Sequence, residues 1–240
     1  MIHKLLLMTL ILLTSCFKDK SSESVKALKF EQEHQEYLDS VKSKSSEILK
    51  ESFDFQGIEV VYVQAGETYY QWLGHVLIRF VGSGKIPEED YGVSFIANFN
   101  DYNLDNLKAY YGGYTVLPII DNWGNYLKDY VVKEKRYMDR YIFPVNESVK
   151  NKIKETLKDW IVNPENTGTY SFMRNSCTAL LLKLLAAGDK EVDGAKIAFP
   201  VEVVPYLQSI GKINHSYKRI TVDNYLDLAN QIVPREKYEY

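Results

Sequence analysis

Cysteine is scarce in this sequence, and the position of one of its two cysteines points to chemistry. Cys177 lies in the run from Tyr170 to Leu185, where polar residues lead directly into an apolar helical stretch. This pattern predicts that Cys177 stands near a helix N-terminus, where unpaired N–H groups and the helix dipole favour a thiolate over a thiol. A lone thiol is buried and inert, paired between chains, or reactive. The setting of Cys177 favours a reactive thiol.

A cysteine nucleophile needs a base within hydrogen-bond reach, and histidine is the usual one at neutral pH. His75 is the leading candidate because it lies in a predicted core strand, residues 74–81. Alternation along that strand puts His75, Leu77 and Arg79 on one face. Two ionisable side chains on one face are costly unless the face borders a cleft or pairs them. We therefore predict a catalytic dyad in which the sulfur of Cys177 lies roughly 3–5 Å from a ring nitrogen of His75.

A third polar residue is expected to orient the imidazole of His75. Ser94 and Asn98 are four residues apart and share a face of the next predicted strand, and Asp90 is a further candidate. The sequence does not choose among the three.

Arg79 has two possible roles. It is a candidate for binding a phosphate or carboxylate of the substrate, and equally a candidate for a scaffold ion pair with Glu134 or Asp139. Arg136 is expected to belong to the scaffold.

The sequence offers little support for a metal or cofactor site. His34 has no second ligand one helical turn away, and His215 lies in a polar segment that is expected at the surface. There is no HExxH, no CxxC and no pair of histidines at ligand spacing. We expect neither a metal nor another cofactor.

Residues 1–16 have the organisation of a bacterial lipoprotein signal. A basic start at Lys4 precedes the apolar run 5–13, and small residues then lead to Cys16. The run is too short to span a bilayer and has the length of a signal-peptide core. We expect the mature chain to begin at a lipidated Cys16, anchored in the membrane without spanning it. An Asp directly after Cys16 would be a signal for retention in the inner membrane, but Phe17 stands there. We therefore expect the anchor in the outer membrane of the cell envelope, with the domain facing the periplasm.

The composition of the chain after the signal is that of a globular domain, which the lipid anchor is expected to hold at a membrane surface. The net charge is −3, or −4 without the signal, and no basic stripe typical of nucleic-acid binding occurs. No later stretch approaches the length of a membrane helix. With 45% hydrophobic residues, the about 190 residues after the tether suffice for one domain with its own core. The oligomeric state is left open.

The periodicity predicts an α+β domain with an antiparallel sheet and packed helices. We divide the chain into a signal peptide (1–15), a lipidated tether with a surface helix (16–52) and the domain (53–240). Residues 17–25 suit a flexible tether, and residues 17–50 are expected to contribute little to the core. Strands are predicted at 58–63, 74–81, 91–97 and 137–143, a glycine bend in 110–118, and helices at 27–49, after Asn146, from 175 or 176 to Gly188 and around 225–232.

Five short motifs occur in order within residues 58–187: GHVLIR (74–79), DYGVSF (90–95), YGGY (111–114), EKRYMDRY (134–141) and YSFMRNSCT (170–178). The set resembles the N-terminal periplasmic domain of the bacterial lipoprotein N-acyltransferase Lnb. That family is similar to circularly permuted papain-like (NlpC-type) thiol enzymes, in which the histidine strand precedes the cysteine helix. The resemblance implies this fold, with Cys177 as nucleophile and His75 as base.

Two positions depart from the family pattern. Ser176 stands where an asparagine usually precedes the cysteine, and Ile78 stands where leucine is common. Lnb itself continues into transmembrane helices, so we expect a short lipoprotein form of the family without that part.

Three functions follow from these observations. The first is a thiol acyltransferase or hydrolase of the cell envelope that acts on acyl groups of lipids or lipoproteins. The second is an NlpC-type murein amidase or peptidase, which would need a polar groove in place of an apolar slot. The third is a non-catalytic lipoprotein that binds lipid or a partner protein.

Overall fold

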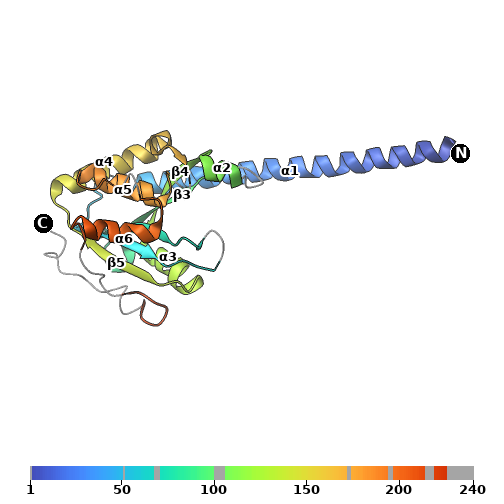
Figure 1. Cartoon of the computed structure of the whole chain (residues 1–240). Coiled ribbons are helices and arrows are strands. Elements are labelled where there is room, and N and C mark those ends of the chain that lie inside the picture. The colour runs from blue at the N-terminus through green and yellow to red at the C-terminus, as the bar shows by residue number, and fades with distance from the viewer. Residues whose placement is uncertain are drawn as a thin grey trace.

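The computed structural model describes residues 2–50, 52–67, 71–99, 106–171, 174–193, 197–213 and 219–225. At its centre is a six-stranded sheet of order β5-β1-β2-β3-β4-β6 in which every neighbouring pair is antiparallel (Figure 1). The predicted α+β class with an antiparallel sheet is confirmed. The strands are β1 (Gly57–Val63), β2 (His75–Val81), β3 (Tyr91–Ala97), β4 (Tyr114–Asn122), β5 (Met138–Phe143) and β6 (Thr169–Tyr170).

Helices cover both faces of the sheet. Val60 and Val76 belong to the larger core, which includes the apolar faces of α4 and α5. Val61 and Leu77, their neighbours in sequence, belong to a smaller core on the other face with α3 and η3. The helices are α1 (Ile2–Ile48), α2 (Asn106–Tyr111), α3 (Trp123–Leu127), the π-helix η3 (Lys128–Lys133), α4 (Glu147–Val162), α5 (Cys177–Gly188) and α6 (Pro200–Ser209), with 3-10 turns η2 (Pro87–Glu89) and η4 (Pro164–Thr167).

β2 and β3 are paired over only part of their lengths. β2 pairs with β1 along its whole length, and β3 does the same with β4. The β2–β3 ladder joins only Ile78–Phe80 to Tyr91–Val93. His75–Leu77 therefore has no partner strand on its β3 side. This break in the ladder lies at the end of the sheet that carries His75.

The helix that carries Cys177, α5, packs against the amphipathic helix α4. In α4, Asn146 is the N-cap and its side chain accepts a hydrogen bond from the Val149 N–H at 3.0 Å. The four-residue rhythm of α4 buries Val149, Ile153, Leu157 and Trp160. α5 packs against α4 and β2, so its first residue lies near the start of β2.

α1 differs from the expected tether and surface helix. It runs without interruption from Ile2 to Ile48, through the segment 17–25 that was expected to be flexible. No glycine or proline occurs before Gly57 to end a helix. Ser45 is buried, and Leu49 directly after the helix belongs to the larger core. The expectation that residues 17–50 contribute little to the core is therefore wrong at the end of this segment.

Two elements were not predicted, one in a segment where paired glycines indicated only a bend and one in the proline-containing segment after residue 197. Residues 114–122 form β4, which includes Pro118. β6 pairs only with Tyr114 and Thr115, so Pro118 faces no further strand and its missing N–H costs nothing. Residues 200–209 form α6, where Pro200 occupies the first turn and needs no hydrogen-bond partner.

The predicted helix around 225–232 lies outside the described residues, apart from Tyr225. No helix within the described ranges is long and apolar enough to cross a membrane.

Candidate active site

Cys177 is the first residue of α5 and follows the N-cap Ser176, as the sequence predicted. It is half-buried and is not in a disulfide. Backbone N–H groups of Val76 and Thr178 donate hydrogen bonds to its sulfur. Burial nevertheless raises the pKa of the Cys177 thiol, because desolvation of a thiolate outweighs these hydrogen bonds. The expected preference for a thiolate is therefore wrong, and the resting group is a thiol.

His75 is the first residue of β2, and its ring is held on one side. Nε2 lies 2.7 Å from the Ser94 hydroxyl, and the Tyr130 ring packs against the imidazole with centroids 5.9 Å apart. Burial lowers the pKa of His75 to about 4, and the positive charge of Arg136 contributes to the same shift. The imidazole is therefore neutral at physiological pH and can accept a proton.

The side chains of His75 and Cys177 approach the break in the β2–β3 ladder from opposite faces of the sheet. Val76 belongs to the larger core, and Cys177 packs against it. Alternation turns the side chain of His75 to the other face, where it meets Ser94 and Tyr130. Within the described part of the chain, no hydrogen bond joins the Cys177 thiol to the His75 ring. The 3–5 Å contact of the dyad stays a prediction.

Both residues line one pocket of about 180 Å³. Its walls include the unpaired end of β3, with Phe95 and Ala97, together with Phe99 beyond it. Tyr170, Ala198 and Pro200 come from later segments of the chain. The polar side chains in this lining are those of His75, Ser176, Cys177 and Tyr170, so the pocket is an apolar slot with its reactive groups together.

Of the three candidates for orienting His75, the structure places Ser94 against its ring. The Ser94 hydroxyl is also hydrogen-bonded to the hydroxyl of Tyr130. When Nε2 carries the ring proton, Ser94 accepts it and Nδ1 is left as the basic atom. The sequence left this choice open, and the fold decides it through the register of β2 and β3.

Asn98 and Asp90 have other partners. Asn98 Oδ1 lies 2.5 Å from Nε2 of His34, and its amide nitrogen donates to Thr115 at 3.2 Å. Asn98 is therefore not an orienting residue of His75, and the contact assigns to His34 a role in docking α1. Asp90 binds Arg79. His215 lies outside the described residues.

Arg79 is part of a buried ion-pair cluster and lies outside the pocket. Its Nη2 is 2.7 Å from Asp90 and its Nη1 is 3.2 Å from Glu59, and the residue is 1% exposed. Glu59 also lies 3.7 Å from the buried Arg140. The proposed contact of Arg79 with substrate is wrong because both carboxylates already occupy its guanidinium group in the interior.

The expected scaffold partners of Arg79 pair elsewhere. Glu134 binds Arg136 at 2.7 Å, and Asp139 binds Arg219 at 2.8 Å. Arg136 is buried and also donates to the backbone oxygen of Gln64, which confirms that it belongs to the scaffold.

Tyr130 was missed by sequence reasoning, although it contacts both His75 and Ser94. Its ring is stacked on Tyr126, one helical turn earlier, with centroids 6.3 Å apart and ring planes within 4°. Burial raises the pKa of Tyr130, so its hydroxyl stays protonated. The i, i+4 pair of tyrosines was the available signal, but the segment shows no clear helical periodicity.

The described ranges contain no group of three or more His, Cys, Asp or Glu side chains placed to hold a metal ion. The chemistry that the pocket can offer is that of a thiol, a neutral imidazole and the N–H groups at the start of α5.

Comparison with protein families shows to which family the chain belongs. The model of the Lnb N-terminal periplasmic domain matches residues 44–209. Comparison with curated proteins and with solved structures gave no match. The matched range runs from the last turn of α1 to the end of α6 and includes His75, Ser94 and Cys177. Because the match covers most of the chain, the protein belongs to the Lnb N-terminal periplasmic domain family and is a protein of the periplasmic side of the cell envelope.

Proposed function

We propose that this protein is a thiol acyltransferase or hydrolase that acts on acyl groups of lipids or lipoproteins through Cys177 and His75. The observation that carries the proposal is the shared pocket: the thiol and the neutral imidazole both line one apolar slot at the break in the β2–β3 ladder. The arrangement of a histidine strand followed by a cysteine helix supports a permuted papain-like enzyme.

The first half of the reaction forms a thioester. Nδ1 of His75 takes the proton of the Cys177 thiol as the sulfur attacks an ester or amide carbonyl. N–H groups at the start of α5 stabilise the resulting oxyanion. The carbon–oxygen or carbon–nitrogen bond then breaks, and the imidazolium returns the proton to the leaving alcohol or amine.

The second half releases the acyl group. An amine or a water molecule attacks the thioester carbonyl, and His75 accepts its proton. The carbon–sulfur bond breaks, and the imidazolium protonates the sulfur to restore the thiol. With an amine the product is an amide and the protein is a transferase. With water the product is a carboxylic acid.

The raised pKa of Cys177 and the lowered pKa of His75 favour this route over a preformed ion pair. Burial disfavours both charged groups in the resting site, so the proton moves as the carbonyl is attacked. The sulfur of Cys177 is therefore activated only when a substrate carbonyl is bound in the slot.

The lining of the pocket favours acyl chains over murein peptides. Phe95, Ala97, Phe99 and Pro200 present apolar surface, whereas a peptide needs hydrogen-bonding partners for its amides. A lipid anchor at Cys16 would keep the pocket close to membrane-derived acyl groups, with the outer membrane as the proposed location.

The test is intact-protein mass spectrometry of the full chain after incubation with phospholipid in mixed micelles. The wild-type protein should gain the mass of one acyl chain, and neutral hydroxylamine should remove it because it cleaves thioesters and spares oxygen esters. Cys177→Ser should give no hydroxylamine-labile adduct, and His75→Ala should label slowly. Lys152→Ala, which changes an exposed ion pair on α4, is the matched control and should label like wild type.

Two other outcomes would replace this proposal. Cys177-dependent cleavage of murein fragments without an acyl adduct would support the NlpC-type amidase. Absence of both activities, together with a Cys177 that does not react with iodoacetamide in the folded protein, would support a non-catalytic lipoprotein.

A further inference from the structure

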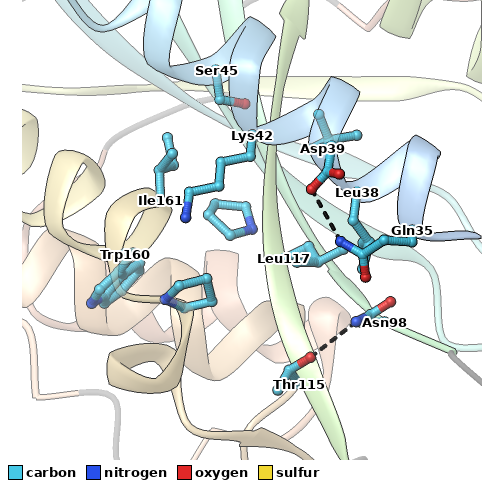
Figure 2. Close-up of a pocket in the computed structure, with 13 residues that line it drawn as sticks. Gln35, Leu38, Asp39, Lys42, Ser45, Asn98, Thr115, Leu117, Trp160 and Ile161 are labelled. Atoms are coloured by element: carbon cyan, nitrogen blue, oxygen red, sulfur yellow. Dashed lines mark hydrogen bonds between the residues drawn. The ribbon is translucent and has the colours of Figure 1, made fainter.

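A second cavity lies between α1, β4 and α4, apart from the pocket of Cys177 (Figure 2). Its volume is about 240 Å³. Apolar side chains from all three elements line it, with Leu38 from α1, Leu117 from β4, and Trp160 and Ile161 from α4. Polar residues also line the cavity (Gln35, Asp39, Lys42, Ser45, Asn98 and Thr115), but most of the surface that faces it is apolar. The cavity is better suited to hydrocarbon than to water.

Two polar residues of α1 at this cavity, the buried Ser45 and the exposed Lys42, can donate hydrogen bonds to a ligand. Ser45 is 1% exposed, and its hydroxyl has no hydrogen-bond partner among the described residues. Lys42, three residues earlier, lies on the same side of the helix. Its ammonium group makes one long contact, 3.4 Å to the backbone oxygen of Val162. In Figure 2 the Lys42 side chain extends toward Trp160 and Ile161.

The acidic residue of the cavity is turned to another partner. Asp39 accepts a hydrogen bond from Gln35 at 3.0 Å, as Figure 2 shows. Neither the exposed ammonium group of Lys42 nor the buried hydroxyl of Ser45 is paired with Asp39. An exposed ammonium group and a buried hydroxyl three residues apart on α1 can each donate a hydrogen bond to an anionic head group, and the apolar walls suit the chain attached to it.

We propose that this cavity binds a single-chain amphiphile with a carboxylate head, a fatty acid. The hydrocarbon chain would lie against Leu117 and Trp160, and the carboxylate would accept hydrogen bonds from Lys42 and Ser45. The volume suits part of one chain and not a two-chain lipid. Because α1 supplies one wall, the ligand also holds α1 against the body. The inference goes beyond the proposed function and does not depend on Cys177 being a nucleophile.

The test uses 11-bromoundecanoate, whose bromine quenches tryptophan fluorescence at short range, with the full chain held in amphipol. Saturable quenching is expected, and Trp160→Phe should remove most of it. Trp123 is fully buried elsewhere, and Trp72 is exposed and lies next to Leu73 of the Cys177 pocket. Quenching that persists in Trp160→Phe would therefore overturn the assignment of the ligand to this cavity.

The head-group contacts have their own controls. Lys42→Gln should weaken binding about fivefold, the effect of losing a partly screened ion pair. Ser45→Ala should weaken it by a factor of about three to five, the effect of one neutral hydrogen bond. Lys44→Gln is the matched control, because Lys44 lies on the same helix but pairs with Asp121 at 2.6 Å. The affinity of this variant for 11-bromoundecanoate should stay within about twofold of the wild-type value. The methyl ester of the ligand should bind about as weakly to wild type as the acid binds to Lys42→Gln.

Three results would overturn the proposal: no saturable quenching, equal losses in Lys42→Gln and Lys44→Gln, or equal affinity for acid and methyl ester. Cys177→Ser should bind with unchanged affinity. Failure of the proposed thioester chemistry would thus not affect the test of fatty-acid binding, and failure of fatty-acid binding would not affect the test of thioester formation.

Discussion

The Ser94 hydroxyl lies 2.7 Å from Nε2 of His75, across the part of the sheet where β2 and β3 are no longer paired. A side-chain contact thus joins the two strands where the backbone ladder has ended. Tyr130 completes the group through its own hydrogen bond to Ser94. The ring of His75 is held on this side through Nε2, and the proposed reaction uses its other nitrogen, Nδ1.

Ser94→Ala should slow acylation of Cys177 by about tenfold or more, because the imidazole loses the group that fixes its tautomer and orientation. The free energy of unfolding should fall by only about 1 kcal/mol, the typical effect of one hydrogen bond. The rate of acyl-adduct formation by mass spectrometry and a urea unfolding curve measure the two effects. Ser94→Thr, which keeps the hydroxyl, should recover part of the rate. Equal rates in Ser94→Ala and wild type would remove Ser94 from the site.

Alkylation of Cys177 by iodoacetamide should increase with pH and reach its midpoint above the ordinary thiol pKa of about 8.5. Burial raises the pKa of Cys177, and the neutral His75 offers no cation to lower it. The measurement is the alkylation rate between pH 4 and 10, with Cys177→Ser as the blank. A plateau of high reactivity between pH 5 and 7 would instead indicate a thiolate–imidazolium pair and contradict this prediction.

The lowered pKa of His75 predicts a loss of stability in acid. Its folded-state pKa of about 4 lies below the ordinary value of 6.5, so the unfolded chain binds more protons in this interval. The contribution is fully present above pH 6.5 and is lost as the pH falls toward 4. It amounts to at most about 3.5 kcal/mol, since one pKa unit corresponds to about 1.4 kcal/mol.

His75→Gln should flatten this pH dependence, because glutamine does not titrate. Thermal unfolding of both proteins between pH 4 and 7 provides the measurement. His34→Gln is the matched control, because it removes a histidine on α1 and leaves His75 in place. If the slopes of wild type and His75→Gln agree, another group is responsible for the acid sensitivity.

Arg79→Ala should destabilise the fold by about 3–5 kcal/mol, because removal of one partner leaves the buried Glu59 and Asp90 carboxylates without their ion pair. Lys133→Ala removes an exposed ion pair with Asp129 and should cost less than about 1 kcal/mol. Urea unfolding curves measure both changes. A cost for Arg79→Ala no greater than that for Lys133→Ala would show that the cluster is not structural.

Truncation should separate the two parts of α1. A chain that begins at residue 24 retains the contacts of His34, Ser45 and Leu49, and should keep a cooperative melt. A chain that begins at residue 50 loses Leu49 from the larger core and should be less stable by about 2–5 kcal/mol, the range for loss of one large core side chain. Equal melting temperatures of the two chains would show that α1 does not stabilise the fold.

Local sequence patterns were sufficient for the elements that carry the site. β-branched and aromatic runs marked β1, β2, β3 and β5, because these side chains favour a pleated, buried surface. The polar-to-apolar boundary before Cys177 marked the start of α5, because such a boundary is visible in neighbouring residues alone. β4 and α6 were not predicted, because the paired glycines before β4 indicated only a bend and the prolines after residue 197 indicated loops, although Pro200 lies in a helix first turn where proline has little cost.

The sequence by itself determined which residues were available for chemistry: a lone thiol at a helix start and a histidine on an early strand, in motifs of the Lnb family. Only the tertiary structure decided which partners these and the other candidate residues contact. Ser94 rather than Asn98 meets His75, and Arg79 is directed into an ion-pair cluster, because strand register and sheet face depend on contacts between segments far apart in the chain. Burial reversed the expected ionisation of Cys177 for the same reason: desolvation is a property of the packed interior and cannot be read from neighbouring residues in the sequence.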